Sequence, residues 1–416
     1  MNSSTAFRTG KGTRNRQSHI PPSKPTTQVP FPTKSSSAFP PAFPFQQLPA
    51  PNGPAPYRYD LANLLPAADI QTIKDSGVMV FHTVGDTGDS RGEQQDFVAE
   101  MMASDFNGPV GNGVQPSFFY HLGDVVYFAG DIDMYAANFY TTYKDYPGFI
   151  VAISGNHDCQ PDDPSDVKTD GPVDPDKVPF DGFVKNFMSP DPSLAGSLKT
   201  GATRTQMDLP NVYWTLLTPL ATIIGLCSNV GESEGEFHQD QIDWFHGELT
   251  AVDKTLPLII AVHHPPFSGD TEHGGSTVVD NMLSAAFTAT GVYPDMILSG
   301  HVHNYQRFTN TVSLADGTTK EIACVVAGAG GYSKLGLIHQ VNGAYPPRNT
   351  PLDLGNGLVL ENYDQENFGF LRCEVTNAAI TATYLSAPYV AGQVRAGVAA
   401  DSFKIDRATK TVSTGP

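Results

Sequence analysis

Five short polar segments constrain the fold of this chain more than any other feature of its sequence. They are Gly85-Asp86-Thr87-Gly88, Gly123-Asp124-Val125-Val126-Tyr127, Gly155-Asn156-His157-Asp158, Val262-His263-His264-Pro265 and Ser299-Gly300-His301-Val302-His303. Most of them directly follow a short apolar run that is typical of a buried strand. Open α/β sheets place their binding sites just beyond the carboxyl ends of their strands. The segments therefore predict a fold in which distant loops meet at one edge of a sheet.

The runs around these segments alternate between strand and helix character. Strands are expected at 77–84, 116–122 and 149–154, with helices around 97–102 and 132–143 between them. A β-α-β-α-β order of this kind predicts a mostly parallel sheet. Farther along the chain, a helix at 239–252 precedes several runs of strand character, which indicate a second sheet. The chain is expected to end in a hairpin at 402–412.

The charge of the chain is strongly acidic and unevenly distributed. The net charge is −18, although Met1 to Tyr57 contains six Lys or Arg residues and no Asp or Glu. The rest of the chain is therefore strongly acidic. It would repel the backbone of a nucleic acid, which argues against that class of partner. A membrane span is not expected, because no apolar run reaches about 18 residues. The N-terminus also lacks the hydrophobic segment of a secretory signal, which indicates either a cytoplasmic protein or a mature form without its leader.

Residues 1–57 form a proline-rich, basic region that differs from the rest of the chain. They include twelve prolines and three Phe-Pro steps. This composition favours an extended polyproline conformation over a packed domain. The region is either a disordered tail or an arm that lies along its own acidic body or along a neighbouring subunit. In the last case the protein would assemble as a homo-oligomer through the arm.

Residues 159–211 interrupt the alternation of strands and helices. They contain many Asp, Pro and Gly residues and one short amphipathic stretch at 183–188. The Asp residues lack the spacing of an EF-hand, which favours a solvated acidic loop over a calcium site. We interpret this stretch as an insertion that lies over the rim of the site.

The side chains of the five segments suit a site that binds two metal ions. Hydrolysis of a phosphate ester needs positive charge near the phosphorus and an activated water molecule, and two neighbouring cations supply both. Carboxylate, amide and imidazole ligands of this kind suit iron, manganese or zinc. Each segment alone is weak evidence, because Gly-Asp pairs are common in turns and a histidine is often an ordinary core or loop residue. The prediction depends on all five segments occurring together in this order.

Together, the five segments resemble the calcineurin-like metallophosphoesterase superfamily and, within it, the purple acid phosphatases. The blocks of that family read GDxG, GDxxY, GNH followed by an acid, VxxH and GHxH, and the fourth block departs here because Ile260 replaces its valine. The resemblance covers roughly 77–385. It implies an α/β fold, a four-layer α/β/β/α sandwich of two packed mixed sheets flanked by helices. We expect this catalytic domain to span 58–416.

The resemblance also implies a role for each residue of the site. One metal ion would be held by Asp86, Tyr127 and His303, and the other by Asn156, His263 and His301. Asp124 would bridge the two ions. His157 and His273 would lie outside the metal ligands and contact the phosphate. The implied ions are Fe(III) and a divalent ion, which would be Fe, Zn or Mn.

Position 88 separates the purple acid phosphatases from the wider superfamily. Many members of the superfamily have Asp-x-His in the first block, whereas this chain has Gly88 at the third position of that block. Tyr127 can replace the missing histidine as a ligand. A phenolate is a hard anionic donor, and it suits Fe(III) better than a divalent ion.

The function that these features imply is acid phosphatase activity on small phosphate monoesters. We expect in-line attack on phosphorus by a metal-bound hydroxide, with protonated His273 or His157 donating a proton to the leaving alcohol. An acidic pH optimum follows from that protonated histidine. The sequence leaves two alternatives open, a phosphodiesterase on the same scaffold and a non-catalytic protein that binds phosphate or metal. No nucleic acid or membrane is expected as a partner.

Overall fold

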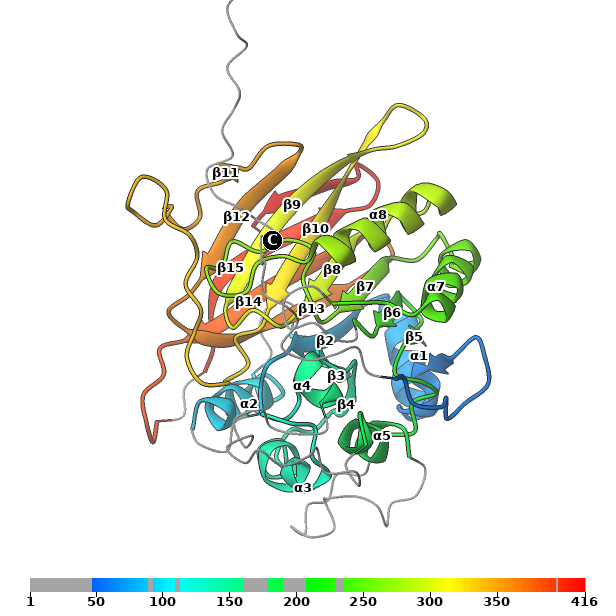
Figure 1. Ribbon diagram of the computed structural model, residues 1–416, viewed down its shortest axis with the longest axis vertical. Helices are drawn as coiled ribbons and strands as arrows, with labels where there is room; N and C mark the ends of the chain where they lie inside the picture. Colours follow the sequence, from blue (N-terminus) through cyan, green and yellow to red (C-terminus); the bar gives the residue numbers. More distant parts are fainter. Residues whose placement is uncertain are drawn as a thin grey trace, which may run out of the picture.

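Two β-sheets pack face to face and are covered by helices in the computed structural model of this protein (Figure 1). The structure describes residues 47–88, 93–108, 113–160, 178–189, 207–228, 235–393 and 396–415. The two sheets and their helices form the layered α/β sandwich that the sequence implied, so the expected fold class is confirmed. Within the described residues, no helix has the length and apolar character needed to cross a membrane.

In the described part of the chain, the first sheet has seven strands in the order β16-β15-β14-β13-β2-β3-β4. Its parallel part consists of β2 (Met79–Val84), β3 (Phe118–His121) and β4 (Phe149–Ala152). The helices α2 (Gln94–Ser104) and α3 (Ile132–Tyr135) connect these strands, and α3 continues as a π-helical stretch, η2 (Ala136–Thr141). The β-α-β-α-β order predicted from the sequence is therefore present.

The remainder of the first sheet comes from the end of the chain. Its strands are β13 (Phe368–Val375), β14 (Ala379–Ala387), β15 (Val398–Asp406) and β16 (Thr411–Thr414). β13 runs antiparallel to β2, with Leu371 opposite Thr83. The expectation of a mostly parallel sheet is therefore wrong, and so is the expectation that all later strands form a second sheet. β13 is buried along nearly its whole length, and it lies inside the sheet between β2 and β14.

The second sheet has nine strands within the described residues, in the order β1-β5-β6-β7-β8-β10-β9-β12-β11. They are β1 (Arg58–Asp60), β5 (Trp214–Leu217), β6 (Thr222–Leu226), β7 (Leu258–Val262), β8 (Met296–Ser299), β9 (Tyr305–Ser313), β10 (Thr319–Ala327), β11 (Leu352–Asp353) and β12 (Leu358–Asp364). Two helices, α7 (Gln239–Ala251) and α8 (Thr277–Thr290), cover its outer face (Figure 1).

The central strand β7 shows how side-chain alternation builds these layers. Ile259 and Ala261 belong to the core between the two sheets. Ile260 and Val262 point to the other face and join the core beneath α7 and α8, where Phe245 lies. Since both faces of the strand are buried, its sequence is continuously apolar instead of alternating with polar residues.

Among the residues that the structure describes, the other helices are η1 (Leu61–Asn63), α1 (Ala67–Ser76), α4 (Asn156–Cys159) and α5 (Asp181–Phe187). α5 matches the amphipathic stretch expected inside the insertion 159–211, but most of that insertion lies outside the described residues. Residues 1–46 of the proline-rich region also lie outside them.

A buried ion pair joins the two sheets. Arg307 on β9 donates to Asp401 on β15 through Nε at 2.7 Å and Nη2 at 3.2 Å, and the Tyr305 hydroxyl donates to the same carboxylate at 2.7 Å. The Arg307 side chain is about 1% exposed and that of Asp401 about 2%. The two charges therefore depend on each other for compensation.

Replacing Asp401 by alanine should lower the free energy of unfolding by about 3–5 kcal/mol, because the Arg307 guanidinium would stay buried without its carboxylate. Urea unfolding followed by circular dichroism measures this change. The matched control is Lys404→Ala on the same strand, where the half-exposed side chain predicts a change within about 0.5 kcal/mol. A loss below about 1 kcal/mol for Asp401→Ala would contradict the role of this pair.

Candidate metal centre

The five polar segments meet where the two sheets present the carboxyl ends of their strands. Asp86, Asp124 and Asn156 follow β2, β3 and β4 of the first sheet, while His263 and His301 follow β7 and β8 of the second. Backbone hydrogen bonds hold the loops together. The Asp86 amide donates to the Gly123 carbonyl at 3.0 Å, and the Gly300 amide donates to the His263 carbonyl at 3.0 Å. This convergence at one edge is the arrangement that the sequence predicted.

Three of these loops hold a side chain on strained backbone. Asp86, Asp124 and His301 have φ angles of 59°, 52° and 66°, in the left-handed region that non-glycine residues rarely adopt. Such a conformation costs about 1 kcal/mol or more for each residue and is found mainly at functional sites. The three strained residues therefore lie in the loops whose side chains surround the candidate site.

A first cluster of donor atoms surrounds the Tyr127 hydroxyl. That oxygen lies 3.1 Å from Asp86 Oδ1, 2.8 Å from Asp124 Oδ2 and 3.3 Å from His303 Nε2. The Asp86 and His303 atoms are themselves 3.7 Å apart. The His303 side chain is 16% exposed, so this cluster reaches solvent at one side.

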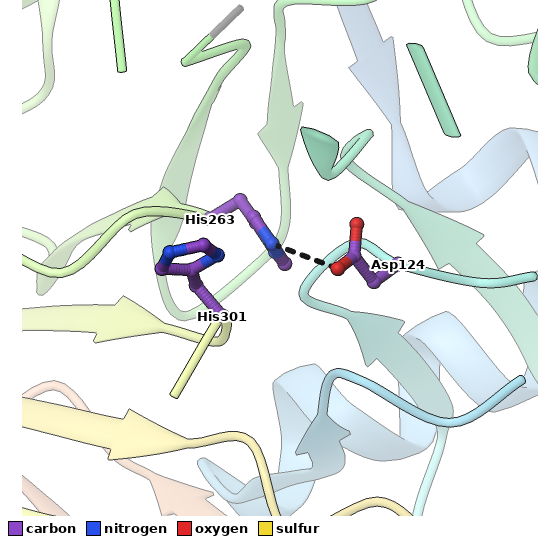
Figure 2. A group of neighbouring side chains, drawn as sticks. All are labelled: Asp124, His263 and His301. Carbon is purple, nitrogen blue, oxygen red and sulfur yellow. Dashed lines mark ion pairs between the residues drawn. The ribbon is translucent and has the colours of Figure 1, made fainter. Parts of the chain in front are cut away.

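A second cluster surrounds Asn156 Oδ1. This atom lies 3.1 Å from His263 Nε2 and 3.0 Å from His301 Nδ1. Asp124 Oδ2 lies 3.3 Å from His263 Nε2. Figure 2 shows Asp124, His263 and His301 facing one another, and one ligand atom from each lies within 4.8 Å of the others.

The two clusters share one atom. Asp124 Oδ2 faces the Tyr127 hydroxyl of the first cluster and His263 Nε2 of the second. The other oxygen, Oδ1, accepts the backbone N–H of His157 at 2.9 Å, which fixes the orientation of the carboxylate. A carboxylate in this position can bridge two ions.

His263 tests whether the residues present fit a metal ion. Its Nδ1 lies 2.8 Å from the Leu122 carbonyl oxygen, which can only accept, so Nδ1 carries the proton. In a neutral ring, Nε2 then carries a lone pair, and it faces two further acceptors, Asn156 Oδ1 and Asp124 Oδ2. Three lone pairs that point at one another need a cation or a proton between them. The donor set therefore fits a metal ion.

The protonation states agree with this requirement. Burial alone would lower the pKa of His263, but the neighbouring Asp124 raises it to about 9, so without a metal a proton fills the gap. Burial opposes ionisation of Asp124, yet His263 and His157 hold its pKa well below its usual value. Burial also lowers the pKa of His303 to about 3, which leaves that imidazole neutral and able to bind a metal.

The two histidines expected to contact phosphate flank the clusters from different sides. The His157 ring lies 4.4 Å from the Tyr127 ring, and its Nδ1 donates to the Phe128 carbonyl at 2.7 Å. The His273 ring lies 4.8 Å from the His301 ring and 5.6 Å from that of His303. The structure therefore brings all nine expected site residues together, while their roles as ligands or catalytic groups remain predictions.

Two residues of the site were not expected from the sequence. Asp270 Oδ1 accepts the backbone N–H of His273 at 2.8 Å, and its Oδ2 accepts from the Asn304 side chain at 3.3 Å, beside His303. Tyr332 stacks on the Tyr127 ring at 3.6 Å. The glycines just before Tyr332 in Gly328-Ala329-Gly330-Gly331 indicate a close approach of the backbone, but nothing in the sequence around Asp270 marks it.

Gly88 occupies a place that allows no side chain. A carbon added there would lie 2.5 Å from Val126 Cα and would also collide with the Val125 carbonyl. Position 88 therefore cannot accept a histidine while the loop that carries Tyr127 keeps this path. The absence of a side chain at position 88 thus lets residues 125 and 126 pass close to Gly88, on the path that brings the Tyr127 hydroxyl to Asp86.

Comparison with known proteins relates this geometry to a family. Residues 79–305, more than half of the chain, match the family model described as calcineurin-like phosphoesterase, and all nine expected site residues lie within the match. The chain is 23% identical over 290 residues to human tartrate-resistant acid phosphatase type 5. The aligned region covers 65% of this chain and 75% of that protein. It is 32% identical over 80 residues to purple acid phosphatase 21 of Arabidopsis thaliana, and this shorter alignment covers 18% of this chain and 17% of that protein. A solved structure described as "Structure of PhoD" shares the fold, with a TM-score of 0.52 and 13% identity over 89% of this chain and 73% of that one.

Replacing Gly88 by alanine should lower the free energy of unfolding by about 3 kcal/mol, the upper end of ordinary overpacking costs. Thermal unfolding measures the effect. The control is Gly108→Ala, where nothing lies within 4 Å of the added carbon and the expected change is below about 0.5 kcal/mol. Equal effects of the two substitutions would show that the loop after β3 yields easily, contrary to the packing described.

Proposed function

The chain belongs to the calcineurin-like phosphoesterase family, and from this premise we propose that it hydrolyses phosphate monoesters at a centre of two metal ions, as an acid phosphatase. The observation that carries the proposal is the shared atom Asp124 Oδ2, which lies between two separate clusters of donor atoms. The similarity to human tartrate-resistant acid phosphatase type 5 over 290 residues supports the choice of acid phosphatase within the family.

The proposed ligands follow the two clusters. Asp86, Tyr127 and His303 hold one ion, and Asn156, His263 and His301 hold the other. Asp124 bridges them. The distances within each cluster support this division, since Tyr127 contacts Asp86 and His303, while Asn156 contacts both of the remaining histidines.

The proposed ions are Fe(III) next to Tyr127 and a divalent ion, Fe, Zn or Mn, next to Asn156. The Tyr127 hydroxyl supports this assignment because a phenolate is a hard anionic ligand. Burial and the nearby carboxylates Asp124 and Asp86 raise the pKa of Tyr127 when no metal is bound. A strongly charged ion is therefore needed to make this side chain a phenolate.

When bound, the two ions supply positive charge to the phosphoryl oxygens and lower the pKa of a water molecule. The residues of the chain position the substrate and move its protons. His157 is fixed by the bond from its Nδ1 to the Phe128 carbonyl, so its Nε2 is the atom available to the phosphate. His273 has a buried Nδ1 without a hydrogen-bond partner among the described residues, and it serves as the acid that protonates the leaving alcohol.

Removal of the shared carboxylate should affect both ions. Asp124→Ala is expected to lose both metals and to reduce hydrolysis of p-nitrophenyl phosphate by more than about a hundredfold, since changes around the ligands alone often cost that much. His303→Ala should lose the ion next to Tyr127 and any violet absorbance while it keeps the other ion. Metal analysis of the purified variants and their visible spectra measure both effects.

The control for these variants is Asp69→Ala, an exposed acid on α1, which should keep the metal content and activity of the unmodified chain. An Asp124→Ala protein that retains two ions would contradict the bridging role. A colourless unmodified protein with two divalent ions would contradict the assignment of iron and tyrosinate, while it would leave the two-metal centre in place.

Removal of the proposed acid should affect substrates according to their leaving groups. His273→Ala should reduce hydrolysis of alkyl phosphates by about a hundredfold more than hydrolysis of p-nitrophenyl phosphate, whose leaving group needs no proton. Glu272→Ala, at the exposed neighbouring position, serves as the control and should affect both substrates alike. Equal losses in His273→Ala would remove His273 as the acid, and faster hydrolysis of bis-p-nitrophenyl phosphate than of the monoester would overturn monoester specificity.

A further inference from the structure

A cavity of about 790 Å³ opens beside α7, and none of its lining residues belongs to the metal centre. We call it the α7 pocket and define it by Leu48, Pro56, Tyr57, Tyr213, Asp240 and Trp244. Its volume lies within the range of about 300–1,000 Å³ that is typical of ligand sites. The metal centre and the proposed catalysis give this pocket no role.

Three aromatic side chains line the pocket. The rings of Tyr213 and Trp244 lie 4.9 Å apart, and Tyr57 meets Tyr213 edge-on at 5.6 Å. Grooves lined by tyrosine and tryptophan are the surfaces on which proline-rich segments dock in an extended polyproline conformation. The chemistry of the pocket therefore favours a proline-rich occupant.

One wall of the pocket is already a proline-rich stretch of this chain. Residues 47–56 contain four prolines. The indole N–H of Trp244 donates to the Pro56 carbonyl at 2.6 Å, and the backbone N–H groups of Asn52 and Gly53 both donate to the Pro210 carbonyl at 2.9 Å. The carboxyl end of the proline-rich region is thus held against α7.

The sequence before Gln47 supplies a matching segment. Ile20 to Lys34 contains five prolines, two lysines, Phe31 and no acidic residue, and it includes the PxxP sequence Pro22-Ser23-Lys24-Pro25. The residues between 35 and 46 carry no charge. The pocket contributes the exposed carboxylate of Asp240, which would complement a lysine. The chain from Lys34 to Gln47 can span about 40 Å when extended, so this segment can reach the pocket.

We propose that the α7 pocket binds the chain's own segment Ile20–Lys34 in a polyproline conformation. The aromatic rings of the pocket accept the prolines, and Asp240 pairs with one of the lysines. The proposal commits to the segment of the same molecule, because the proline-rich region already leads to the wall of this pocket.

The test uses the full chain and a variant of it in which Pro21, Pro22 and Pro25 are replaced by serine. A fluorescein-labelled synthetic peptide of residues 20–34 is titrated with each protein, and its anisotropy is measured. The peptide should bind the serine variant at least about tenfold more tightly than the unmodified chain. The reason is that a tethered segment competes at an effective concentration near the millimolar range.

Charge reversal in the pocket provides the matched control. In the serine variant, Asp240→Lys should weaken peptide binding about fivefold, the effect of one exposed charge pair worth about 1 kcal/mol. Asp243→Lys lies on the same helix, is exposed and does not line the pocket, so it should leave the affinity unchanged. Equal losses from the two reversals would reduce the binding to general attraction by an acidic surface and would overturn the proposal.

Two further outcomes would overturn it. The first is the absence of peptide binding to the serine variant, or equal affinity of the peptide for both proteins. The second concerns mass, measured by light scattering. A dimer of the unmodified chain that becomes a monomer in the serine variant would assign the occupant to a neighbouring copy instead of the same molecule.

Discussion

The Asp124 carboxylate makes the contacts on which the arrangement of the candidate metal centre depends. One oxygen faces Tyr127 and His263, and the other accepts the N–H of His157. The backbone of Gly155 approaches this carboxylate so closely that an added side-chain carbon would overlap Asp124 Oδ1. Position 155 therefore has to be glycine because any side chain there would displace the Asp124 carboxylate, and not only because the chain turns at this point. This side chain, together with the backbone hydrogen bonds between the loops, fixes the loop after β4 next to the loop after β3.

The centre would be costly to bury without a positive charge. Asp86, Asp124, Asn156, His263 and His301 are each at most 3% exposed, and an unpaired carboxylate in such a place is unfavourable by several kcal/mol. The raised pKa of His263 provides part of the compensation as a bound proton. A metal ion in the same place would provide more charge with the same ligand atoms.

The sequence predicted which side chains lie just after the ends of strands. It did not predict which strands from distant parts of the chain pair with each other. Asp86, Asp124 and Asn156 could be identified because each follows an apolar run that has to be a buried strand. The pairing of β13 with β2 could not be predicted, because β13 is as apolar as strands of the second sheet. Its sequence carries no local signal that favours β2 over a strand of that sheet. Asp270 carries no signal in the sequence, because its carboxylate accepts backbone N–H groups of Glu272 and His273 that come close to it only in the folded loop.

The meeting of loops from both sheets at one edge divides the donors by element. Asp86, Asp124, Tyr127 and Asn156 all follow strands of the first sheet, and each presents an oxygen. His263, His301 and His303 all follow strands of the second sheet, and each presents a nitrogen. Neither half of the sandwich can offer a mixed coordination shell by itself. An ion held there would take its ligands from both sheets. Binding of the ion and the relative position of the two sheets would therefore be thermodynamically linked.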